Sequence, residues 1–512
     1  MKINRKKNAV MGTMFGILLK MTQIIFPFIF RTIFIHTLGV EYLGLNSLFS
    51  ALLQVLNLAE LGVGSAMVFS MYRPIAEDDI NKICQLMNLY KLYYRLLGLV
   101  VLVIGIAFVP ILPNLITGSV PSDVNIYILY ALHLSATVLS YWLYAYRNSL
   151  FNAHQRNDII SIIAIIVNIC FYGLQMIALL LFKSYYLYLC LSLFAQIVIN
   201  LVTAVISKRY FPNLNPCGKL PKEEQREINR KVRDLFTAKI GSVINNSADS
   251  LVISAFLGLE LLAIYQNYYQ IIVAIMAIFN IFFSACTAGI GNSLIVNTKE
   301  QNQRLLYNIN HMTFMAVNFC CACFINMCQP FMQLWAGEKY QLDFSFVILF
   351  AVYLLAEEGP RTLVVFKDAG GIWRSDRFRP FLAACVNIIL NLILTPLIGL
   401  YGIIISTIFA LMFVAYPWLI ININRRLFII DVKKYVIRIL LYILVGAISS
   451  GISYAISNII IVDSLILTII IRFIIAAIVS SAVFICIFYR TDENKYLLQQ
   501  LNSVKNKVLR GR

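Results

Sequence analysis

The sequence predicts an all-α polytopic membrane protein of about 14 transmembrane helices, in two six-helix lobes related by a parallel pseudo-repeat plus two C-terminal helices. Three observations predict this fold class: the composition, the number of long apolar runs, and the placement of basic residues between them. The 512 residues are 60% hydrophobic, with a mean hydropathy of +0.80. Soluble domains hold about 45–50% apolar residues, so the chain is expected to lie in a membrane.

Fourteen apolar runs are long enough to cross about 30 Å of hydrocarbon as helices. They cover residues 9–36, 42–70, 92–112, 124–150, 158–182, 185–206, 237–257, 261–290, 309–334, 344–366, 380–398, 400–422, 435–460 and 464–489.

The basic residues predict the orientation of these runs. With the N-terminus in the cytoplasm, the inner segments hold 35 of the 42 Lys and Arg, and the outer loops hold only Lys183 and Lys339. A miscounted helix would exchange inner and outer loops and spoil this asymmetry. We therefore expect both termini inside and an even number of helices. The net charge of +18 is explained by orientation, and no nucleic-acid partner is expected.

The longest segment between apolar runs, residues 207–236, divides the chain. It begins with the turn-forming "PNLNPCGKLP" and continues as "KEEQREINRKVRDLF", the pattern of an amphipathic helix on the membrane surface. The predicted domains are an N-terminal lobe (1–206), this linker (207–236), a C-terminal lobe (237–424), two further helices (425–490) and a basic cytoplasmic tail (491–512).

An internal repeat relates the two lobes. "LGVEYLGLNSLF" at residues 38–49 aligns with "LGLELLAIYQNY" at residues 257–268, and in both copies a Lys lies nineteen residues before the second-position Gly. Both copies start from the predicted cytoplasmic side, which indicates a parallel repeat. Transporters built from repeated halves bind their substrate between them.

The first run carries two cations in a stretch otherwise suited to lipid. Lys20 and Arg31 are eleven residues apart, about three helical turns, so they share a face, with Gln23 on the same side. Each charge at the centre of a span costs about 2.5–3.5 kcal/mol. This cost is tolerable if the side chains line an internal cavity.

The corresponding run of the second half has its own polar stripe. Lys239, Ser242, Asn246 and Ser250 fall on one face, and Asp249 lies beside it. In the second run of the first half, Gln54, Asn57 and Glu60 follow at three-residue spacing. The competing interpretation is that these acids simply pair with the cations of the first run and hold the bundle together.

Another span is interrupted by charge and proline. In "YLLAEEGPRTLVVF", Arg361 can pair with Glu357 or Glu358 across the break at Pro360. A role in ion coupling and a local ion pair at a kink both fit this pattern. We therefore treat Glu60, Asp249, Glu357, Glu358 and Arg361 as coupling or ion-pair candidates.

The sequence holds no motif of a catalytic or metal site. Phosphate-binding loops, the H-E-x-x-H pattern and the G-x-S-x-G pattern are all missing from it. Cys320, Cys321, Cys323 and Cys328 are interpreted as small residues on a spanning helix, because no His or second C-x-x-C accompanies them at zinc spacing. We therefore expect no enzyme activity, no metal and no cofactor.

Three stretches resemble a known family. They are "LGVEYLGLNSLFSALLQVLNLAELGVGSAM" (38–67), "ADSLVISAFLGLELLAIYQNYYQI" (248–271) and "RFRPFLAACVNIILNLILTPLIGLYGIIISTI" (377–408). Together they are similar to the bacterial polysaccharide transporter family, the Wzx-type flippases of O-antigen and capsule repeat units, within the multidrug/oligosaccharidyl-lipid/polysaccharide exporter superfamily. The resemblance extends over nearly the whole chain.

This resemblance implies an alternating-access flippase of the bacterial cytoplasmic membrane. Its substrate would be an undecaprenyl-diphosphate-linked oligosaccharide, with H⁺ or Na⁺ as a coupling ion and polymerase and chain-length proteins as partners. By position, Arg31 and Lys20 match the cationic residues expected to engage the diphosphate, followed by Lys239. Gln23, Asn57 and Asn246 are the further candidates for substrate contact.

Three rival functions stay open. A multidrug antiporter of the same superfamily shares the fold, but a cationic stripe would repel cationic drugs. A lipid II-type flippase for cell-wall precursors is poorly separated by sequence. A membrane-embedded glycan polymerase or glycosyltransferase usually has a large extramembrane loop, which these 512 residues do not contain.

Overall fold

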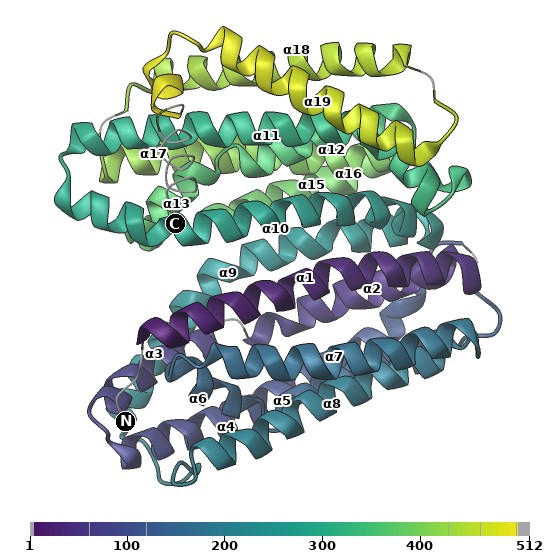
Figure 1. Ribbon diagram of the computed structural model, residues 1–512. Coiled ribbons are helices and arrows are strands. Elements are labelled where there is room, and N and C mark those ends of the chain that lie inside the picture. The colour runs from purple at the N-terminus through teal and green to yellow at the C-terminus, as the bar shows by residue number, and fades with distance from the viewer. Residues whose placement is uncertain are drawn as a thin grey trace, which may run out of the picture. The chain divides into compact units, whose positions relative to one another are not determined.

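The computed structural model describes residues 5–497 and 499, except 61, 119, 429 and 461; the side chains of residues 5–10, 59, 238, 239, 242, 245, 246 and 288 are also outside the description. The described chain consists of helices and short connections without a β-strand (Figure 1). It divides into two compact units, unit 1 (Met1–Ala263) and unit 2 (Ile264–Arg512). The predicted all-α class is confirmed.

Unit 1 contains the first nine α-helices and three 3-10 segments. They are α1 (Arg5–Thr37), α2 (Val40–Leu56), η1 (Asn57–Glu60), α3 (Val63–Ala76), α4 (Ile80–Phe108), η2 (Val109–Leu115), α5 (Ile126–Trp142), η3 (Ala145–Arg147), α6 (Asn148–Ala153), α7 (Asn157–Leu180), α8 (Tyr185–Tyr210) and α9 (Lys222–Leu257). Helices α1 and α7 pack along much of their length, and α8 lies against α7 and α5 (Figure 1).

Unit 2 contains most of α10 (Leu259–Val296), whose first residues still belong to unit 1. It continues with α11 (Lys299–Trp335), η4 (Glu338–Tyr340), α12 (Phe344–Glu358), α13 (Arg361–Ala369), α14 (Trp373–Asp376), α15 (Arg379–Ile398), α16 (Leu400–Phe409), the π-helical turn η5 (Ala410–Ala415), α17 (Tyr416–Arg426), α18 (Val432–Ile459) and α19 (Leu465–Ile487). The long helix α11 packs against α12, α18 and α19.

Every one of the fourteen predicted runs falls on helix in the described chain. Ten helices among the described residues are individually long and apolar enough to cross a membrane, or eleven when the bent pair formed by α5 and Ala145–Ala153 counts as one span. The runs that do not pass alone correspond to shorter apolar helices, such as Val40–Leu56 and Ser247–Leu257. The chain is a multi-pass membrane protein.

The internal repeat reproduces a local backbone feature. Gly39 separates α1 from α2 with φ 113°, and Gly258 separates α9 from α10 with φ 92°. Side chains with a Cβ rarely adopt such angles, so glycine is required where two helices meet this abruptly. The two copies of the repeat therefore make the same helix–glycine–helix turn.

Besides the run 344–366, whose interruption was predicted, two further runs are not single helices. Residues 42–70 break after Leu56, because the chain turns through η1 and Gly62 before α3 begins. Gly62 has φ 94°, and a Cβ there would lie 2.8 Å from the carbonyl oxygen of Val232 in α9, so the break brings two backbones together. Residues 124–150 bend by 49° after Trp142, where Tyr144 adopts a left-handed φ of 59°.

The predicted surface helix of residues 207–236 and the next predicted span form one continuous helix, α9, that begins at Lys222. Since α9 runs through the predicted boundary without a break, it joins the linker rigidly to the span that follows. The functional division into lobes, linker and tail stays a prediction.

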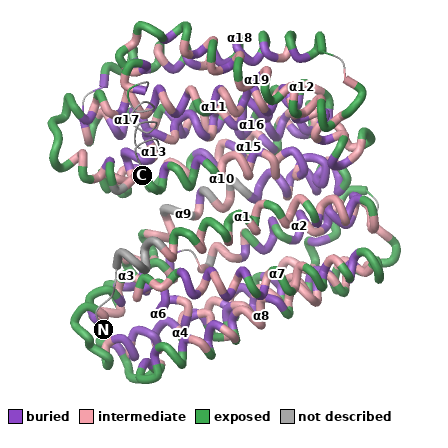
Figure 2. Tube along the Cα trace, viewed as in Figure 1, coloured by how far each residue is buried: buried purple, intermediate pink, exposed green. Residues whose placement is uncertain are grey.

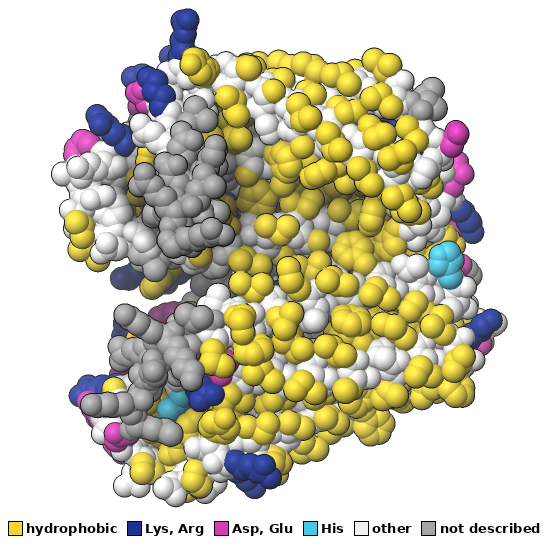
Figure 3. Space-filling model, in the orientation of Figure 1, with side chains coloured by type: hydrophobic (Ala, Val, Ile, Leu, Met, Phe, Trp, Pro, Cys, Tyr) yellow, Lys and Arg dark blue, Asp and Glu magenta, His cyan; other side chains and the backbone are white. Residues whose placement is uncertain are grey.

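Large apolar side chains are exposed on the flanks of the helices in each unit. Leu99, Val103 and Ile106 of α4 and Ile474 and Ile478 of α19 are between 49% and 63% exposed. Figure 2 shows green, exposed stretches along these flanks, and Figure 3 shows hydrophobic side chains over the helix flanks and charged ones mainly near helix ends. This is the distribution that a lipid bilayer requires of a helical protein.

Candidate functional site

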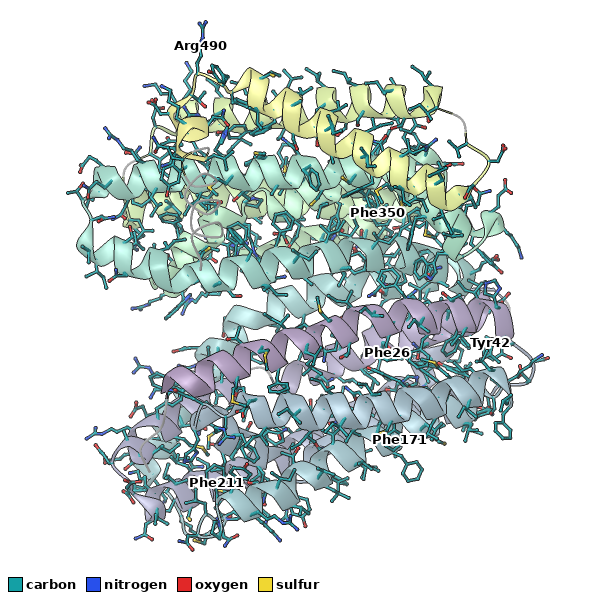
Figure 4. The ribbon with its side chains drawn as sticks, in the orientation of Figure 1. Phe26, Tyr42, Phe171, Phe211, Phe350 and Arg490 are labelled. Atoms are coloured by element: carbon teal, nitrogen blue, oxygen red, sulfur yellow. The ribbon has the colours of Figure 1, made fainter. Side chains whose placement is uncertain are left out.

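The cationic stripe of α1 is divided between two environments. Lys20 and Gln23 are exposed, whereas Arg31 is partly buried. Arg31 interacts electrostatically with Tyr188 of α8, next to an aromatic cluster in which Phe30 and Phe34 lie 5.8 and 4.9 Å from the same tyrosine ring. Figure 4 labels Phe26, which belongs to this cluster and lies 4.2 Å from the ring of Tyr172 in α7. The two cations of α1 thus differ in burial, although an ideal helix would place them alike.

The predicted stripe of Gln54, Asn57 and Glu60 runs from α2, which ends at Leu56, directly into η1. The hydrogen-bond partners of the three side chains lie on different helices. Gln54 accepts a hydrogen bond from Ser247 of α9 at 3.1 Å. Asn57 accepts one from Tyr141 of α5 at 2.8 Å.

Glu60, in contrast, lines a cavity of about 810 Å³ that lies wholly within unit 1. The residues that line the cavity lie on α3, α4, α5, α6 and α8 and on the segments beside these helices. Most of them carry amides, hydroxyls or aromatic rings. The residues are Glu60, Gly64, Ser65, Val68, Phe69, Tyr72, Tyr90, Tyr94, Ser140, Tyr141, Ala145, Asn148, Ser149, Asn152, Asn157, Gln196 and Asn200.

The buried side of this cavity is held by a chain of hydrogen bonds. Tyr90 donates to Tyr94 at 3.0 Å, and Tyr94 donates to the carboxyl group of Glu60. The ring of Tyr141 lies 5.6 Å from that of Tyr94. Asn200 donates to the carbonyl oxygen of Ser140 at 3.1 Å. These bonds fix the floor of the cavity, because each buried polar group has a partner.

Four amide side chains of the lining are not used in this way. Asn148, Asn152, Asn157 and Gln196 make no side-chain hydrogen bond to the part of the chain that the structure describes. Asn152 and Asn157 are exposed, and Asn148 and Gln196 are partly exposed. Each amide offers two donor hydrogens and an acceptor oxygen, so the cavity presents unused hydrogen-bonding capacity to a solute.

The acids of α12 lie at the predicted helix break. Helix α12 ends at Glu358 and α13 begins at Arg361, with Gly359 and Pro360 between them, which confirms the predicted interruption. Glu358 is fully buried, and its carboxylate lies 3.8 Å from the Arg361 guanidinium without a hydrogen bond to any described group. Glu357 is partly buried. The contact is a long ion pair, so it supports both interpretations of this pair.

The remaining candidates lie on α9. Asp249 is buried, with 9% of its surface exposed. The side chains of Lys239 and Asn246 lie outside the described residues. The roles assigned to all three stay predictions.

The sequence interpretation missed the unit 1 cavity. Its lining includes Asn148, near the end of the predicted run 124–150, and Asn152 and Asn157, which lie between that run and the next; none of them belongs to a helical stripe of the sequence analysis. The signal that was available is the local density of amides in "RNSLFNAHQRN", residues 147–157.

Comparison with known proteins now identifies the family. The family model described as "Polysaccharide biosynthesis protein" matches residues 9–287, more than half of the chain. The chain belongs to this family. No curated protein sequence matches it.

Solved structures with the same fold are transporters. A structure of the lipid II flippase MurJ in an inward closed conformation has a TM-score of 0.68 and 15% identity, and the match covers 93% of this chain and 99% of that one. An inward-facing multidrug resistance MATE family transporter of the MOP superfamily has a TM-score of 0.58 and 14% identity, covering 81% and 98%.

A third similar structure is a MOP superfamily transporter from Pyrococcus furiosus, with a TM-score of 0.53 and 14% identity over 82% of this chain and 96% of that one. At these identities the similarity shows the fold and does not transfer a substrate. The family and the fold together place this chain among polysaccharide-related membrane proteins with transporter architecture.

Proposed function

We propose that the protein is a flippase that moves a lipid-diphosphate-linked oligosaccharide from the cytoplasmic to the outer leaflet by alternating access, for surface polysaccharides such as O-antigen or capsule. The observation that carries the proposal is the polar cavity among the membrane helices of a chain that belongs to a polysaccharide family. The described part of the chain is built of helices and short connections, and no separate folded domain lies beside them. Such a protein is suited to move a glycan rather than to synthesise one.

The predicted cations give the diphosphate a binding group. Arg31 is a forked donor suited to phosphate oxygens, and Lys20 is a compact point charge. With Lys239, and with Gln23, Asn57 and Asn246 as polar contacts, they are the proposed substrate residues. A polyprenyl chain is apolar and stays in lipid while the charged part crosses.

The energy source is proposed to be an ion gradient. Asp249, Glu357, Glu358 and Arg361 are the candidates for coupling to H⁺ or Na⁺, and Glu358 is favoured among them because it is fully buried and has only a long ion pair. A buried acid within a membrane helix is a candidate for binding a proton or a cation.

The proposed location is the bacterial cytoplasmic membrane with both termini inside, from the distribution of Lys and Arg. Polymerase and chain-length proteins of a polysaccharide assembly system are the proposed partners.

A lipid II-type flippase is retained as a second candidate. The MurJ match covers 93% of this chain, whereas the MATE match covers 81%. The larger coverage favours a flippase architecture over a multidrug antiporter, and it leaves the glycan to be determined by experiment.

The test is to measure which leaflet holds the lipid-linked oligosaccharide in cells that lack the gene. We expect the lipid-linked oligosaccharide to accumulate in the cytoplasmic leaflet, and the wild-type gene to relieve the accumulation. Arg31→Ala should not relieve it. Arg31→Lys should relieve it in part, because the charge is kept. The matched control is Arg73→Ala, since Arg73 is exposed and pairs with Glu77 at 2.8 Å. Normal leaflet distribution in the deleted strain would contradict the proposal, and lethal depletion with accumulated lipid II would favour the second candidate.

A further inference from the structure

We infer that the unit 1 cavity is the binding site for the glycan part of the transported lipid, and that it takes neutral or amino sugars in preference to uronic acids. The inference rests on the proposed function and adds to it a place and a sugar class. The site lies apart from Lys20 and Arg31 of α1, because neither residue lines the cavity.

The lining has the hydrogen-bonding chemistry that sugars require. A sugar ring carries several hydroxyls, each a donor and an acceptor, and side-chain amides match both roles. Asn148, Asn152, Asn157 and Gln196 supply amides that have no partner in the described chain. A cavity for an apolar tail would leave these groups without partners, at a cost for each one that is buried by the ligand.

Aromatic rings of the lining provide the apolar surface on which sugars pack. Tyr90 and Tyr141 lie on the buried side of the cavity, while Phe69 and Tyr72 are exposed, at 61% and 46%, on its open side. The C–H faces of a sugar pack on such rings, and a Tyr ring adds a hydroxyl at its polar end. The volume of about 810 Å³ falls within the range of small-ligand sites, about 300–1,000 Å³, and suits a short oligosaccharide.

The charges of the cavity determine which sugars fit. Glu60 is the one acid among the described lining residues, and no Lys or Arg is among them. Lys231 lies 5.1 Å over the Phe69 ring, but it is already paired with Glu227 at 2.7 Å. A uronic acid would therefore bring a carboxylate beside Glu60 without a cation to balance it. A neutral sugar avoids this conflict, and an amino sugar gains a partner.

This arrangement gives Glu60 a role in recognition rather than in ion coupling. Its carboxyl group is oriented by the hydroxyl of Tyr94, which is itself held by Tyr90. An acceptor positioned in this way favours a ligand hydroxyl or ammonium in one orientation. Glu60→Gln keeps the size and an acceptor oxygen, so it separates the effect of charge from that of hydrogen bonding.

The test is saturation-transfer NMR of the purified full-length protein in nanodiscs. The probes are N-acetylglucosamine, glucosamine and glucuronic acid, with the organic cation tetraphenylphosphonium as the competing ligand class. We expect the first two sugars to receive saturation and glucuronic acid to receive at least about fivefold less, because its carboxylate would lie beside Glu60 without a cation to balance it. In Glu60→Gln, the N-acetylglucosamine signal should be retained. The additional signal that glucosamine gains from its ammonium group should be lost.

Variants of the lining provide the second readout. Asn152→Ala and Gln196→Leu should each reduce the N-acetylglucosamine signal by about fivefold, because their side chains are at least partly exposed and carry no structural hydrogen bond. The matched control is Asn81→Ala, an exposed amide of α4 outside the cavity, which should leave the signal unchanged.

Any of three results would overturn the inference. The first is equal saturation of glucuronic acid and N-acetylglucosamine. The second is a signal that responds to Asn81→Ala as much as to the lining variants. The third is no sugar signal beside strong binding of tetraphenylphosphonium. If these occur while the gene-deleted strain still accumulates inner-leaflet glycolipid, only the inference fails. If that strain accumulates none, the proposed function fails as well.

Discussion

Asparagine and glutamine side chains of the unit 1 cavity differ in their surroundings from two buried asparagines of unit 2. In unit 1, Gln196 and three asparagines line a cavity without hydrogen bonds to the described chain. In unit 2, Asn318 of α11 donates to the carbonyl oxygen of Tyr442 at 2.9 Å, and Asn326 donates to Ser453 of α18 at 2.9 Å. The same residue type thus faces a cavity in unit 1 and joins helices in unit 2, as Asn200 also does between α8 and α5 of unit 1. Polarity within a membrane protein therefore identifies a binding site only when its hydrogen bonds are left unused.

The largest expected effect is on a charge cluster of unit 2. Asp376 is buried and receives two hydrogen bonds from Arg379, at 2.8 and 3.1 Å, and one from Lys367 at 3.2 Å. Asp376→Asn would leave Arg379 without its counter-charge and Lys367 with only the more exposed Asp368, and should destabilise the protein by about 3–5 kcal/mol. The measurement is the yield of folded protein and its thermal unfolding in detergent.

The neighbouring acid provides the control. Asp368 is 42% exposed and lies 2.9 Å from the same Lys367. Asp368→Asn should cost less than about 1 kcal/mol, as for other exposed ion pairs. Equal effects of the two substitutions would show that burial of the Asp376 cluster adds nothing to the stability of unit 2.

A smaller effect is expected where α11 meets α18. Asn318→Ala removes the bond to Tyr442 and should lower stability by about 0.5–1.5 kcal/mol, the net contribution of one hydrogen bond, because the Tyr442 carbonyl keeps its bond within α18. The effect is measured as a lower unfolding temperature. A Cβ at Gly446 would lie 2.2 Å from the Asn318 oxygen, so Gly446→Ala should disturb the same contact, and the two substitutions together should be less than additive. Strict additivity would contradict this shared contact.

The pH dependence of stability should differ between wild type and a variant of unit 1. His154 follows α6, with its Nδ1 2.7 Å from the Leu150 carbonyl oxygen and its ring 4.4 Å from that of Phe211. Burial lowers the pKa of His154. The folded state therefore disfavours the protonated form, and stability falls as the pH drops below about 6.5, the usual histidine pKa.

In His154→Gln the loss of unfolding temperature between pH 8 and pH 5.5 should be smaller than in the wild type. Comparing the two slopes removes any constant packing effect of the substitution. Parallel slopes would show that this histidine does not contribute to the pH dependence.

The smallest stability change is expected in the cavity. Asn148→Ala should alter the free energy of unfolding by no more than about 0.5 kcal/mol, as for substitutions without structural partners, while glycolipid export falls. This outcome is the reverse of Asn318→Ala, which should lower stability. A large loss of stability in Asn148→Ala would show that the unit 1 amides stabilise the fold, as those of unit 2 do.

The sequence predicted what depends on local pattern. Apolar runs located the helices, and the repeat located the equivalent turns at Gly39 and Gly258. The interruption at Pro360 was predicted because proline cannot continue a helix without losing a hydrogen bond. These features depend on neighbours along the chain.

The cavity could not be predicted in this way, because its residues come from several helices and from the bend after Trp142. The partners of Gln54 and Asn57 could not be predicted for a related reason. They lie on helices distant in the sequence, Ser247 of α9 and Tyr141 of α5. Long-range packing thus decided which of these polar residues share a cavity.

The most direct test of transport uses the purified protein in vesicles. A polyprenyl-diphosphate-linked N-acetylglucosamine with a fluorophore on the sugar is placed in both leaflets, and an impermeant reductant quenches the outer one. With the wild-type protein, quenching should proceed into the inner-leaflet fraction, and Arg31→Ala should stop it at the outer fraction. Quenching that halts at the outer leaflet with the wild-type protein, as in empty vesicles, would contradict the assignment of the chain as a glycolipid flippase.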